Sequence, residues 1–386
     1  MRSFTYQNPT KIYFGEGVVK KLGAEVAKYG KNALFVYGKE SIKKSGLYDL
    51  VKGQLSSNGV KFVEHGGVKA NPSYKHTREG VEKARAAGVD VVVAVGGGSV
   101  VDESKAIALT LAGVDFWDVL AKGAPVTACL PVVDVMTMPA TGSEMNGCFV
   151  ITKEDTLEKF GTGGGLASHP RASFLDPTYT LTISQKQTAY AASDMMSHLM
   201  EGYMTTEREV VSTCSYIEGV LRSVIACAKT LAKNPRDLDA RANIMWSATL
   251  AWNGTGLLGL ENNSLPCHSL EHAMSAVYDI AHGAGLAMVT PAWMKFKADK
   301  IKPRLLSFAK NVLGIDCAGD EKLAIRAFED LLSDIGAPLT WAQVGVENPD
   351  NAELAKHAAK LFAMDGESQQ YPLSDLKAIF DLIPNK

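Results

Sequence analysis

Short runs of apolar, often β-branched residues alternate with amphipathic segments in the first half of the chain. The apolar runs lie at residues 33–37, 60–63 and 91–95. Residues 18–29 and 73–87 place apolar side chains at three- and four-residue spacing with Lys and Glu between them, as a helix covering a sheet does. This alternation predicts βαβ units and therefore a parallel α/β sheet.

The pattern changes near residue 182. Pro177 interrupts the chain, Ser184 can cap a helix, and nearly everything that follows is rich in Ala, Leu, Met, Lys and Glu with helical periodicity. A chain of 386 residues also exceeds what one hydrophobic core usually fills. We therefore expect an α/β domain over residues 1–182 and an all-helical domain over residues 183–386, whose facing side chains can host a metal.

Charge and composition exclude several classes of partner. The formal net charge is −2, and no basic stripe suits nucleic acid or an anionic membrane surface. The stretch from Met1 to Pro9 lacks the apolar core of a signal peptide, and no run of apolar residues is long enough to span a bilayer. The six cysteines form no CxxC pair. We expect a cytoplasmic protein without nucleic-acid or membrane partners.

A glycine-rich turn follows the apolar run at 91–95. Gly96, Gly97, Gly98 and Ser99 come directly after it and open an apparent helix, an arrangement that can bind phosphate through free backbone N–H groups. The dinucleotide fingerprint GxGxxG is absent, because position 101 is Val. Taken alone, the turn is compatible with phosphate binding and with a plain tight turn.

Histidines and one aspartate cluster in the second half. Asp194 and His198 are four residues apart, as are His268 and His272, and His282 follows closely. Residues four apart share a helix face, so each pair can point at one cavity. Mixed Asp and His ligation suits a catalytic divalent cation such as Fe²⁺ or Zn²⁺. We interpret the remaining histidines as structural and Cys267 and the nearby tryptophans as packing residues: His65, His76, His169, His357, Cys267, Trp246 and Trp252.

Taken in order, several motifs resemble the iron-containing (group III) alcohol dehydrogenase family, and within it the butanol dehydrogenase branch. The likeness covers nearly the whole chain. The motifs are Asn8-Pro9-Thr10-Lys11, Phe14-Gly15, Asn71-Pro72, Gly96-Gly97-Gly98-Ser99 with Asp102 and Lys105, Thr141-Gly142-Ser143-Glu144, Asp194 with His198, and the stretch from His268 to His282-Gly283.

The resemblance implies an N-terminal NAD(P)-binding α/β domain and a helical metal-binding domain, as in dehydroquinate synthase, with the active site between them. It implies that Asp194, His198, His268 and His282 are the metal ligands, and that His272 lies beside the nicotinamide. The residues implied to bind the cofactor are Gly97, Gly98 and Ser99 at the pyrophosphate, with Asp102 in the same motif, Thr137, Thr141 and Lys159 along the cofactor, and Gly38, Lys39, Ser41 and Asn71 near the adenosine.

One departure from the branch concerns the cofactor. The branch often has Tyr-Gly-Gly-Gly-Ser where this chain has Tyr37-Gly38-Lys39-Glu40-Ser41. No Asp is present there to bind a ribose 2′-hydroxyl, and several lysines are near, which favours a 2′-phosphate. Glu40 favours NAD instead. We predict a preference for NADP(H), with NAD(H) possible.

The resulting expectation is a homodimeric, metal-dependent enzyme that passes hydride between NAD(P)H and a small primary alcohol or aldehyde of the butanol type. Fe²⁺ is the first candidate for the metal and Zn²⁺ the second. His272 is the candidate proton relay. Two alternatives stay open: a lyase resembling dehydroquinate synthase, disfavoured because no Lys or Arg accompanies the histidines between 268 and 282, and a non-catalytic nucleotide- or metal-binding protein.

Overall fold

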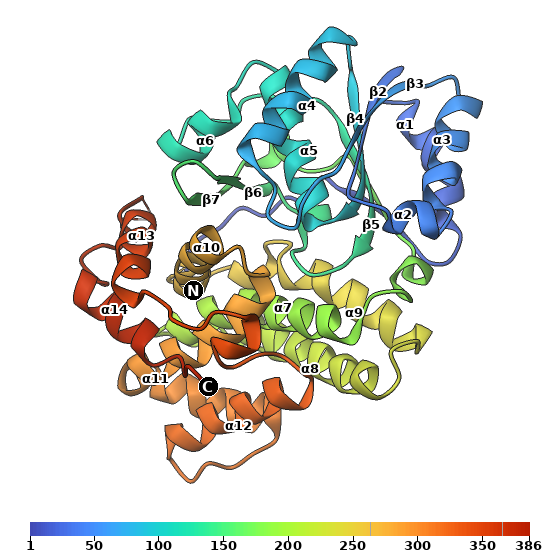
Figure 1. Cartoon of the computed structure of the whole chain (residues 1–386). Coiled ribbons are helices and arrows are strands. Elements are labelled where there is room, and N and C mark those ends of the chain that lie inside the picture. The colour runs from blue at the N-terminus through green and yellow to red at the C-terminus, as the bar shows by residue number, and fades with distance from the viewer. Residues whose placement is uncertain (263, 365) are drawn as a thin grey trace. The chain divides into compact units, whose positions relative to one another are not determined.

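The computed structural model describes residues 1–262, 264–364 and 366–386. It divides the chain into two compact units. One comprises residues 7–182, and the other comprises residues 183–386 together with residues 1–6. Figure 1 shows the strands gathered in the first unit and long helices in the second.

A six-stranded sheet forms the centre of the first unit. Every neighbouring pair in it is parallel, and the strand order is β1-β8-β5-β4-β2-β3. The predicted parallel α/β sheet is therefore confirmed. The strands are β1 (Lys11–Phe14), β2 (Asn32–Tyr37), β3 (Lys61–Gly66), β4 (Val91–Gly97), β5 (Val132–Met138) and β8 (Ala172–Leu175).

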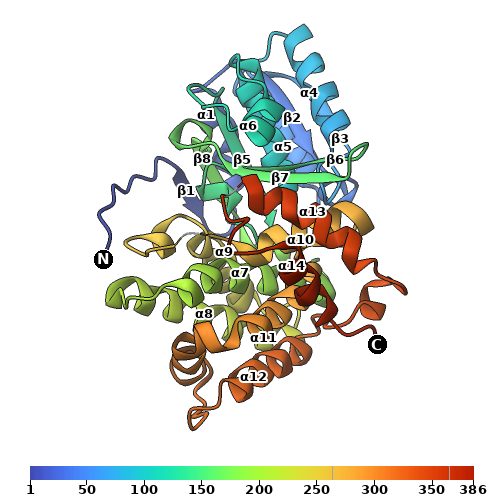
Figure 2. The same ribbon diagram turned by 90° about the vertical axis from the view of Figure 1, so that its left-hand side faces the viewer.

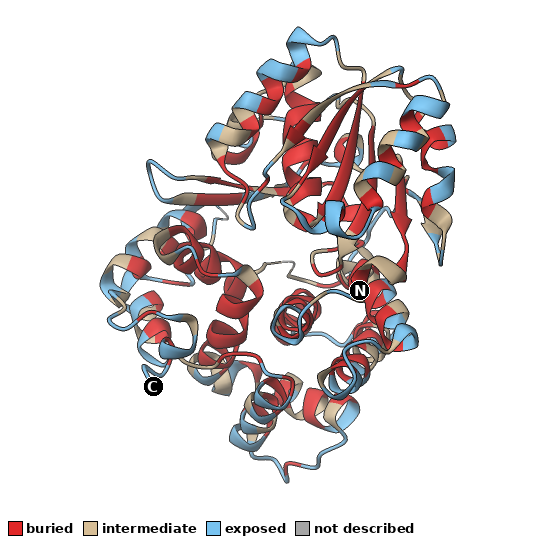
Figure 3. Ribbon diagram, turned by 45° about the vertical axis from the view of Figure 1, so that its right-hand side comes forward, coloured by how far each residue is buried: buried red, intermediate tan, exposed pale blue. Residues whose placement is uncertain are grey.

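Helices cover both faces of this sheet, so its central strands are apolar on both sides. Phe35 packs in one core with Val51 of α3, whereas the neighbouring Leu34 and Val36 point to the opposite face and are also fully buried. Figure 3 shows the strands buried and the outer sides of the helices exposed. The helices are η1 (Val18–Lys21), α1 (Leu22–Val26), α2 (Ser41–Lys44), α3 (Leu47–Ser57), α4 (Tyr74–Ala86), α5 (Gly98–Leu111) and α6 (Phe116–Lys122), with short η2 (Ser143–Met145), η3 (Leu166–Ser168) and η4 (Pro177–Thr180).

The strand order reverses between β2 and β4. From β2 the chain proceeds to β3 on one side and then returns to β4 on the other. At such a switch point, the carboxyl ends of neighbouring parallel strands leave room for a ligand. Gly38 follows β2 directly, and Gly97 ends β4, so the glycine-rich turn lies at this position even though the usual fingerprint is absent.

A two-stranded antiparallel hairpin accompanies the sheet, and sequence analysis did not anticipate it. It pairs β6 (Cys148–Lys153) with β7 (Glu158–Gly163) and is seen at the side of the sheet in Figure 2. Leu157 closes the turn with a positive φ of 50°. This hairpin contains Lys159, which is buried.

The second unit is helical, as predicted. Ser184 accepts a hydrogen bond from the Gln187 backbone and begins α7 with a capping box. Among the described residues, no helix is both long enough and apolar enough to cross a bilayer. The helices are α7 (Gln185–Thr205), α8 (Val211–Lys233), α9 (Leu238–Ala251), η5 (Thr255–Leu257), α10 (Pro266–Tyr278), α11 (His282–Phe308), η6 (Ala309–Leu313), α12 (Glu321–Asp334), η7 (Ala342–Val344), α13 (Asn351–Met364) and α14 (Leu373–Asp381).

The first six residues correct the expected domain limits. We placed residues 1–182 together, whereas residues 1–6 group with the helical unit. The reason is a pair of hydrogen bonds that the sequence pattern does not reveal: the Arg2 backbone N–H donates to the Gly259 carbonyl at 3.0 Å, and the Tyr6 side-chain hydroxyl donates to the Asn253 carbonyl at 3.5 Å.

Candidate functional site

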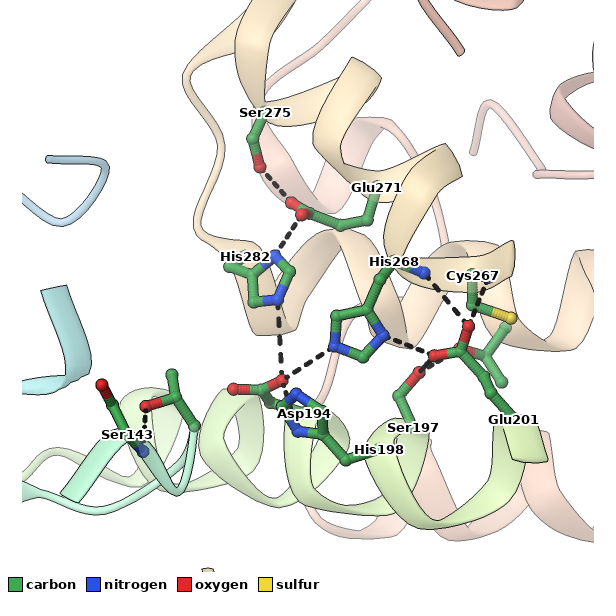
Figure 4. A network of polar contacts seen from close by, with 12 residues as sticks. Ser143, Asp194, Ser197, His198, Glu201, Cys267, His268, Glu271, Ser275 and His282 are labelled. Atoms are coloured by element: carbon green, nitrogen blue, oxygen red, sulfur yellow. Dashed lines mark hydrogen bonds and ion pairs between the residues drawn. The ribbon is translucent and has the colours of Figure 1, made fainter. Parts of the chain in front are cut away.

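Three imidazoles surround one carboxylate oxygen inside the helical unit (Figure 4). Asp194 Oδ1 lies 3.3 Å from His198 Nδ1, 3.6 Å from His268 Nε2 and 3.6 Å from His282 Nε2. The ligand atoms of Asp194, His268 and His282 all lie within 4.8 Å of one another, whereas His198 falls outside that group. We call these four residues the Asp194 cluster. The structure thus brings together all four predicted metal ligands.

Three helices position the cluster. Asp194 and His198 share one face of α7, and His268 lies near the start of α10. After α10 the chain reverses at Asp279, whose φ of 49° is one that Asp tolerates better than most residues. This turn places His282 at the first position of α11, facing the other ligands.

Gly283 allows α11 to approach α7 closely. A Cβ at this position would lie 2.1 Å from the backbone oxygen of Tyr190, which no side-chain adjustment can relieve. Any larger residue would push the start of α11 away from α7 and separate His282 from Asp194.

The unsatisfied atoms of the cluster fit a bound cation. Asp194 Oδ1, His198 Nδ1 and His268 Nε2 are buried and have no hydrogen-bond partner among the described residues, a costly state unless another group satisfies them. A divalent ion bound tetrahedrally at about 2.0–2.2 Å holds its ligand atoms roughly 3.3–3.6 Å apart, which matches the observed separations of 3.3–3.6 Å. The residues therefore fit the divalent cation that the sequence implied.

Glu201 holds His268 from behind, and sequence analysis missed it. Glu201 Oε1 lies 2.5 Å from His268 Nδ1 and accepts a 2.8 Å hydrogen bond from the Ser197 hydroxyl. Its Oε2 accepts from the Cys267 backbone N–H at 2.6 Å, at the positive N-terminal end of α10. The carboxylate thus caps α10 and turns His268 Nε2 toward Asp194. Its spacing was a usable signal, since residues 194, 198 and 201 share one face of a helix.

A second carboxylate, Glu271, holds the His282 ring through its Nδ1 atom. Its Oε2 pairs with His282 Nδ1, and its Oε1 accepts from the Ser275 hydroxyl. Carboxylates that accept from the outer nitrogen of a ligating imidazole fix the ring's tautomer and orientation. Glu271 is completely buried with no lysine or arginine between residues 268 and 282. A carboxylate that stands among clustered histidines, with no lysine or arginine near it in the sequence, is therefore a signal for this role.

Burial and neighbouring charges set the protonation of the cluster. Burial opposes ionisation of Asp194, but the charges of the neighbouring imidazoles outweigh it and hold its pKa below the usual range. Burial lowers the pKa of His198 to about 3, so this imidazole is neutral at neutral pH. Burial also disfavours the charged form of His268, but Glu201 and Asp194 outweigh it and raise its pKa to about 10. A cation at His268 Nε2 would have to displace that proton.

His272 and Trp252 border the cluster without joining its centre. The His272 ring lies 5.5 Å from that of His282 and 6.5 Å from that of His268, centroid to centroid, so it lies beside the cluster. The Trp252 ring stacks on His198 at 4.8 Å. The Cys267 thiol is fully buried, and burial raises its pKa well above the ordinary value, which agrees with a packing role.

The glycine-rich turn lies at the start of α5 in the other unit. Gly97 occupies the N-cap position without any side-chain cap, so the first N–H groups of the helix are available to an anion. Gly98 is required by its protein surroundings, since a Cβ there would lie 2.3 Å from Thr141 Oγ1. The turn thus fits a phosphate, and Thr141 packs directly against it.

The other residues expected at the cofactor belong to the same unit as this turn. Ser99 donates to the Ala70 carbonyl at 2.5 Å, which ties the turn to the segment containing Asn71. Asp102 is buried and accepts from Ser143 at 2.6 Å and from the Val150 N–H at 3.0 Å, so its oxygens hold protein groups. The remaining predicted residues lie on or just after the strands: Gly38, Lys39 and Ser41 follow β2, Thr137 lies in β5, and Lys159 lies in β7.

Lys105 anchors the same region and was noted only as part of a motif. Its ammonium group is fully buried and donates to the Ser143 and Cys148 carbonyls at 2.7 and 2.8 Å. It also lies 3.3 Å from Asn146 Oδ1. A single side chain on α5 therefore fixes the loop that follows β5 to the first strand of the hairpin.

Comparison with known proteins identifies the family of this chain. Residues 9–177 match the sequence profile of the iron-containing alcohol dehydrogenases, and residues 188–382 match that of the family's C-terminal region. The chain belongs to the iron-containing alcohol dehydrogenase family. The resemblance inferred from the motifs, including the butanol dehydrogenase branch, is confirmed.

Individual members of the family match over nearly the whole chain. NADH-dependent butanol dehydrogenase A of Clostridium acetobutylicum is 39% identical over 93% of this chain and 94% of its own length. An NADPH-dependent aldehyde reductase of Escherichia coli is 32% identical over 92% of both chains. The crystal structure of NADH-dependent butanol dehydrogenase A of Thermotoga maritima superposes with a TM-score of 0.95 at 38% identity, covering 100% of this chain and 99% of that one.

Proposed function

We propose that this chain is a metal-dependent alcohol dehydrogenase and aldehyde reductase. It transfers hydride between NAD(P)H and a small primary alcohol or aldehyde of the butanol and butanal kind. The observation that carries this proposal is the Asp194 cluster, in which three imidazoles converge on one carboxylate oxygen at 3.3–3.6 Å. The butanol dehydrogenases and the aldehyde reductase among its relatives support it over the lyase and over a non-catalytic binding protein.

In this proposal Asp194, His198, His268 and His282 hold the divalent cation, with Fe²⁺ the first candidate and Zn²⁺ the second. When bound, such a cation supplies Lewis-acid polarisation of the substrate oxygen. The chain's own part is orientation and charge. The carboxylate of Asp194 contributes the negative charge, and the outer carboxylates hold two of the imidazoles in place.

The reaction must balance one hydride and one proton. In alcohol oxidation the carbon-bound hydrogen leaves with its electron pair to the nicotinamide, and the hydroxyl proton is released separately; aldehyde reduction reverses both transfers. We propose that His272 relays this proton, because its ring adjoins the cluster without lying on the central carboxylate.

Replacing His272 separates the relay from metal binding. We expect His272→Gln to retain metal but to lower the turnover number about 100-fold, and to flatten its pH profile. The matched control is His357→Gln, which makes the same change in α13 beside Glu353. An unchanged turnover number and pH profile in His272→Gln would remove this residue from the mechanism.

For the cofactor, we propose that the uncapped start of α5, with Gly97, Gly98 and Ser99, binds the pyrophosphate of NAD(P). Asn71 and Gly38 lie toward the adenosine, and Thr137, Thr141 and Lys159 line the rest. We propose a supporting role for Asp102, through the protein groups that it holds. This assignment predicts that Ser99→Ala weakens dinucleotide binding, measured by the fluorescence of the reduced cofactor.

We propose further that NADP(H) is preferred over NAD(H). Lys39 is exposed directly after β2, and Glu40 pairs with Lys43 at 3.0 Å, so its charge is compensated. Relatives use either cofactor. We expect a higher kcat/KM with NADPH than with NADH, and Lys39→Glu to reduce that ratio. Lys31→Glu, at the opposite end of the same strand, is the control. A higher kcat/KM of the wild type with NADH would refute the preference.

The reaction class, metal and cofactor can be tested together. Metal-stripped protein is incubated anaerobically with Fe²⁺ or Zn²⁺, and consumption of NADPH and NADH is followed with butanal. Metal-dependent consumption supports the proposal. Absence of consumption with every metal and a wider aldehyde panel would overturn it.

Assembly and location complete the proposal. We propose a homodimer in the cytoplasm, without nucleic-acid or membrane partners. Light scattering after size-exclusion chromatography should give twice the mass of one chain, and cell fractionation should place the activity in the cytoplasm. A monomer, or activity in a membrane fraction, would contradict these two assignments.

A further inference from the structure

A second group of histidines and a carboxylate lies in the α/β unit, away from the proposed pyrophosphate turn. His65 belongs to β3, His76 to the first turns of α4, and Glu103 to α5. Glu103 Oε1 lies 2.9 Å from His65 Nε2 and 2.7 Å from His76 Nδ1, and the two rings stack at 4.1 Å. Glu103 is completely buried and His65 nearly so. We call these three residues the Glu103 cluster.

Both ring nitrogens of His76 face acceptors. Nδ1 faces Glu103 Oε1, and Nε2 lies 3.2 Å from the Gly66 carbonyl oxygen. An imidazole that donates from both nitrogens carries two protons and is a cation. His65 then donates its Nε2 proton to the same carboxylate. The cluster therefore places the His76 imidazolium and a second imidazole, His65, on one buried carboxylate oxygen.

The surrounding charges favour this protonation. The hydrogen bond to Glu103 raises the pKa of His76, and Glu79 on the same helix acts in the same direction. Burial opposes ionisation of Glu103, but its hydrogen bonds to His65 and His76 outweigh burial and lower its pKa. The groups facing His76 are thus Glu103 from α5, His65 from β3 and Glu79 from α4, and both carboxylates stabilise its positive charge.

A metal ion does not suit these atoms. Their separations of 2.7 and 2.9 Å are those of hydrogen bonds, shorter than the 3.3–3.6 Å between ligand atoms in the Asp194 cluster. The second nitrogen of His76 is already engaged by a backbone carbonyl. The cluster therefore holds protons.

Its position connects it to the proposed cofactor site. Gly66, whose carbonyl accepts from His76, ends β3, and the next residue, Gly67, donates to the Gly38 carbonyl at 2.9 Å. Farther along this connection, Ala70 accepts from Ser99 at the start of α5. The segment containing Asn71 is therefore tied to the turn after β2, to the start of α5, and, through His76, to Glu103 one turn deeper in α5.

We propose that the His76 imidazolium is a positioning residue for dinucleotide binding. It holds the connection between β3 and α4 against α5, and dinucleotide affinity falls as His76 loses its proton. This inference rests on the proposed function. It predicts that the cofactor binds more weakly as pH rises through the raised pKa of His76, because deprotonated His76 can no longer donate to both Glu103 and the Gly66 carbonyl.

The test measures the dissociation constant of NADPH by its fluorescence between pH 7 and 9.5, where its 2′-phosphate is already ionised. We expect His76→Gln to bind about tenfold more weakly than wild type at pH 7, the loss of a charge-assisted hydrogen bond. The dissociation constant of the wild type should rise with pH toward that of the variant. The dissociation constant of the variant should lack the pH dependence that comes from His76. His357→Gln is the control and should follow the wild type.

The outcomes distinguish this inference from the proposed function. Parallel curves for wild type and His76→Gln would overturn the positioning role while leaving the dehydrogenase intact. Absence of both NADPH and NADH binding by the wild type at every pH would overturn both. Loss of bound metal in His76→Gln would also overturn the inference, because the cluster would then be a metal site.

A second measurement uses the wild-type protein, and a variant serves only to assign the His76 signal. The His76 imidazole resonance of the wild-type protein is titrated with and without NADPH. If protonated His76 favours the cofactor, then by linkage the cofactor must raise the pKa of His76. An unchanged pKa would overturn the proposal even if His76→Gln fails to fold.

Discussion

The two histidine clusters use the same side-chain types and differ in where the carboxylates lie. In the Asp194 cluster one carboxylate is central, and two more stand behind the imidazoles, where Glu201 and Glu271 pair with the Nδ1 atoms of their partners. In the Glu103 cluster a single carboxylate receives both imidazoles directly. In the first arrangement the central atoms lie 3.3–3.6 Å apart and lack hydrogen-bond partners among the described residues, whereas in the second both imidazoles lie at hydrogen-bond distance from one carboxylate oxygen.

This difference shows that residue type alone does not define a metal site. The outer carboxylates pair with the Nδ1 atoms of His268 and His282. The Nε2 atoms of these two rings therefore point inward and lie 3.6 Å from Asp194 Oδ1. Without outer carboxylates, His65 and His76 close onto Glu103 at hydrogen-bond distance. The position of the outer acceptors therefore sets whether the rings lie at hydrogen-bond distance from the central carboxylate or farther from it.

The largest effect is expected from the centre of the Asp194 cluster. Asp194→Asn keeps the shape but removes the charge, so bound metal should fall to near zero. Aldehyde reduction should fall by more than about 100-fold, since outer partners alone contribute 10–100-fold in such sites. Metal content is measured by atomic spectrometry. Asp155→Asn, at an exposed pair with Lys75, is the control. Full metal content in Asp194→Asn would reject the cluster as the metal site.

The outer carboxylates should matter somewhat less. Glu271→Gln removes the charge that orients His282, and we expect metal affinity to weaken about 10–100-fold. Competition with a chelator measures this affinity. Glu353→Gln makes the same change beside His357 on an exposed part of α13 and should behave as wild type. Equal metal affinity in Glu271→Gln and wild type would make Glu271 a packing residue only.

The Glu103 cluster should affect stability without any dependence on metal. Glu103→Gln should lower the free energy of unfolding by about 1–3 kcal/mol, because two buried imidazoles lose a charged acceptor. Addition of a chelator should not change this loss of unfolding free energy. Denaturant unfolding measures it, with Glu353→Gln as the exposed control. A decrement that disappears after metal removal would mean that the two clusters do not differ as described.

The decrement should also depend on pH in two directions. The pKa of Glu103 is lowered from 4.5, so its contribution is present above that pH and is lost as pH falls through the lowered value. The pKa of His76 is raised from 6.5, so its contribution is present below that pH and is lost as pH rises through the raised value. The difference in the free energy of unfolding between wild type and Glu103→Gln should therefore be largest between about pH 4.5 and 6.5.

The smallest effect is expected at the aromatic wall of the Asp194 cluster. Trp252 stacks on His198, and the stacking energy of such an aromatic pair corresponds to roughly a 2–10-fold change in a binding constant. Trp252→Ala should weaken metal retention by that amount, and Trp252→Phe should remain near wild type. Trp246→Ala, on partly exposed α9, is the control. Equal metal retention in Trp252→Ala and Trp246→Ala would limit Trp252 to packing.

Local patterns predicted the features that depend on neighbours in sequence. The four-residue spacing of Asp194 and His198 predicted a shared helix face, and Ser184 predicted the start of α7; the structure confirms both. The apolar runs likewise indicated β2, β3 and β4. In each case hydrogen bonds or side-chain periodicity within a few residues decide the outcome.

Features that depend on distant pairing were missed. The role of Glu201 depends on α10, 66 residues later, and the Glu103 cluster joins β3, α4 and α5 across 38 residues. We read His65 and His76 as structural because neither belongs to a spaced pair. The hairpin of β6 and β7 escaped because its strands bury alternate residues only in part and carry charged groups at one end. No local period encodes these contacts.

Glu201 has a consequence for the order in which the protein matures. The carboxylate that orients His268 also occupies the N-terminal end of α10, so one residue serves helix formation and ligand alignment together. The hydrogen bonds that align His268 join protein groups only, so they do not themselves require an ion. Loading with metal can then follow synthesis as a separate event, and a chain emptied by a chelator should regain its ion without having to unfold.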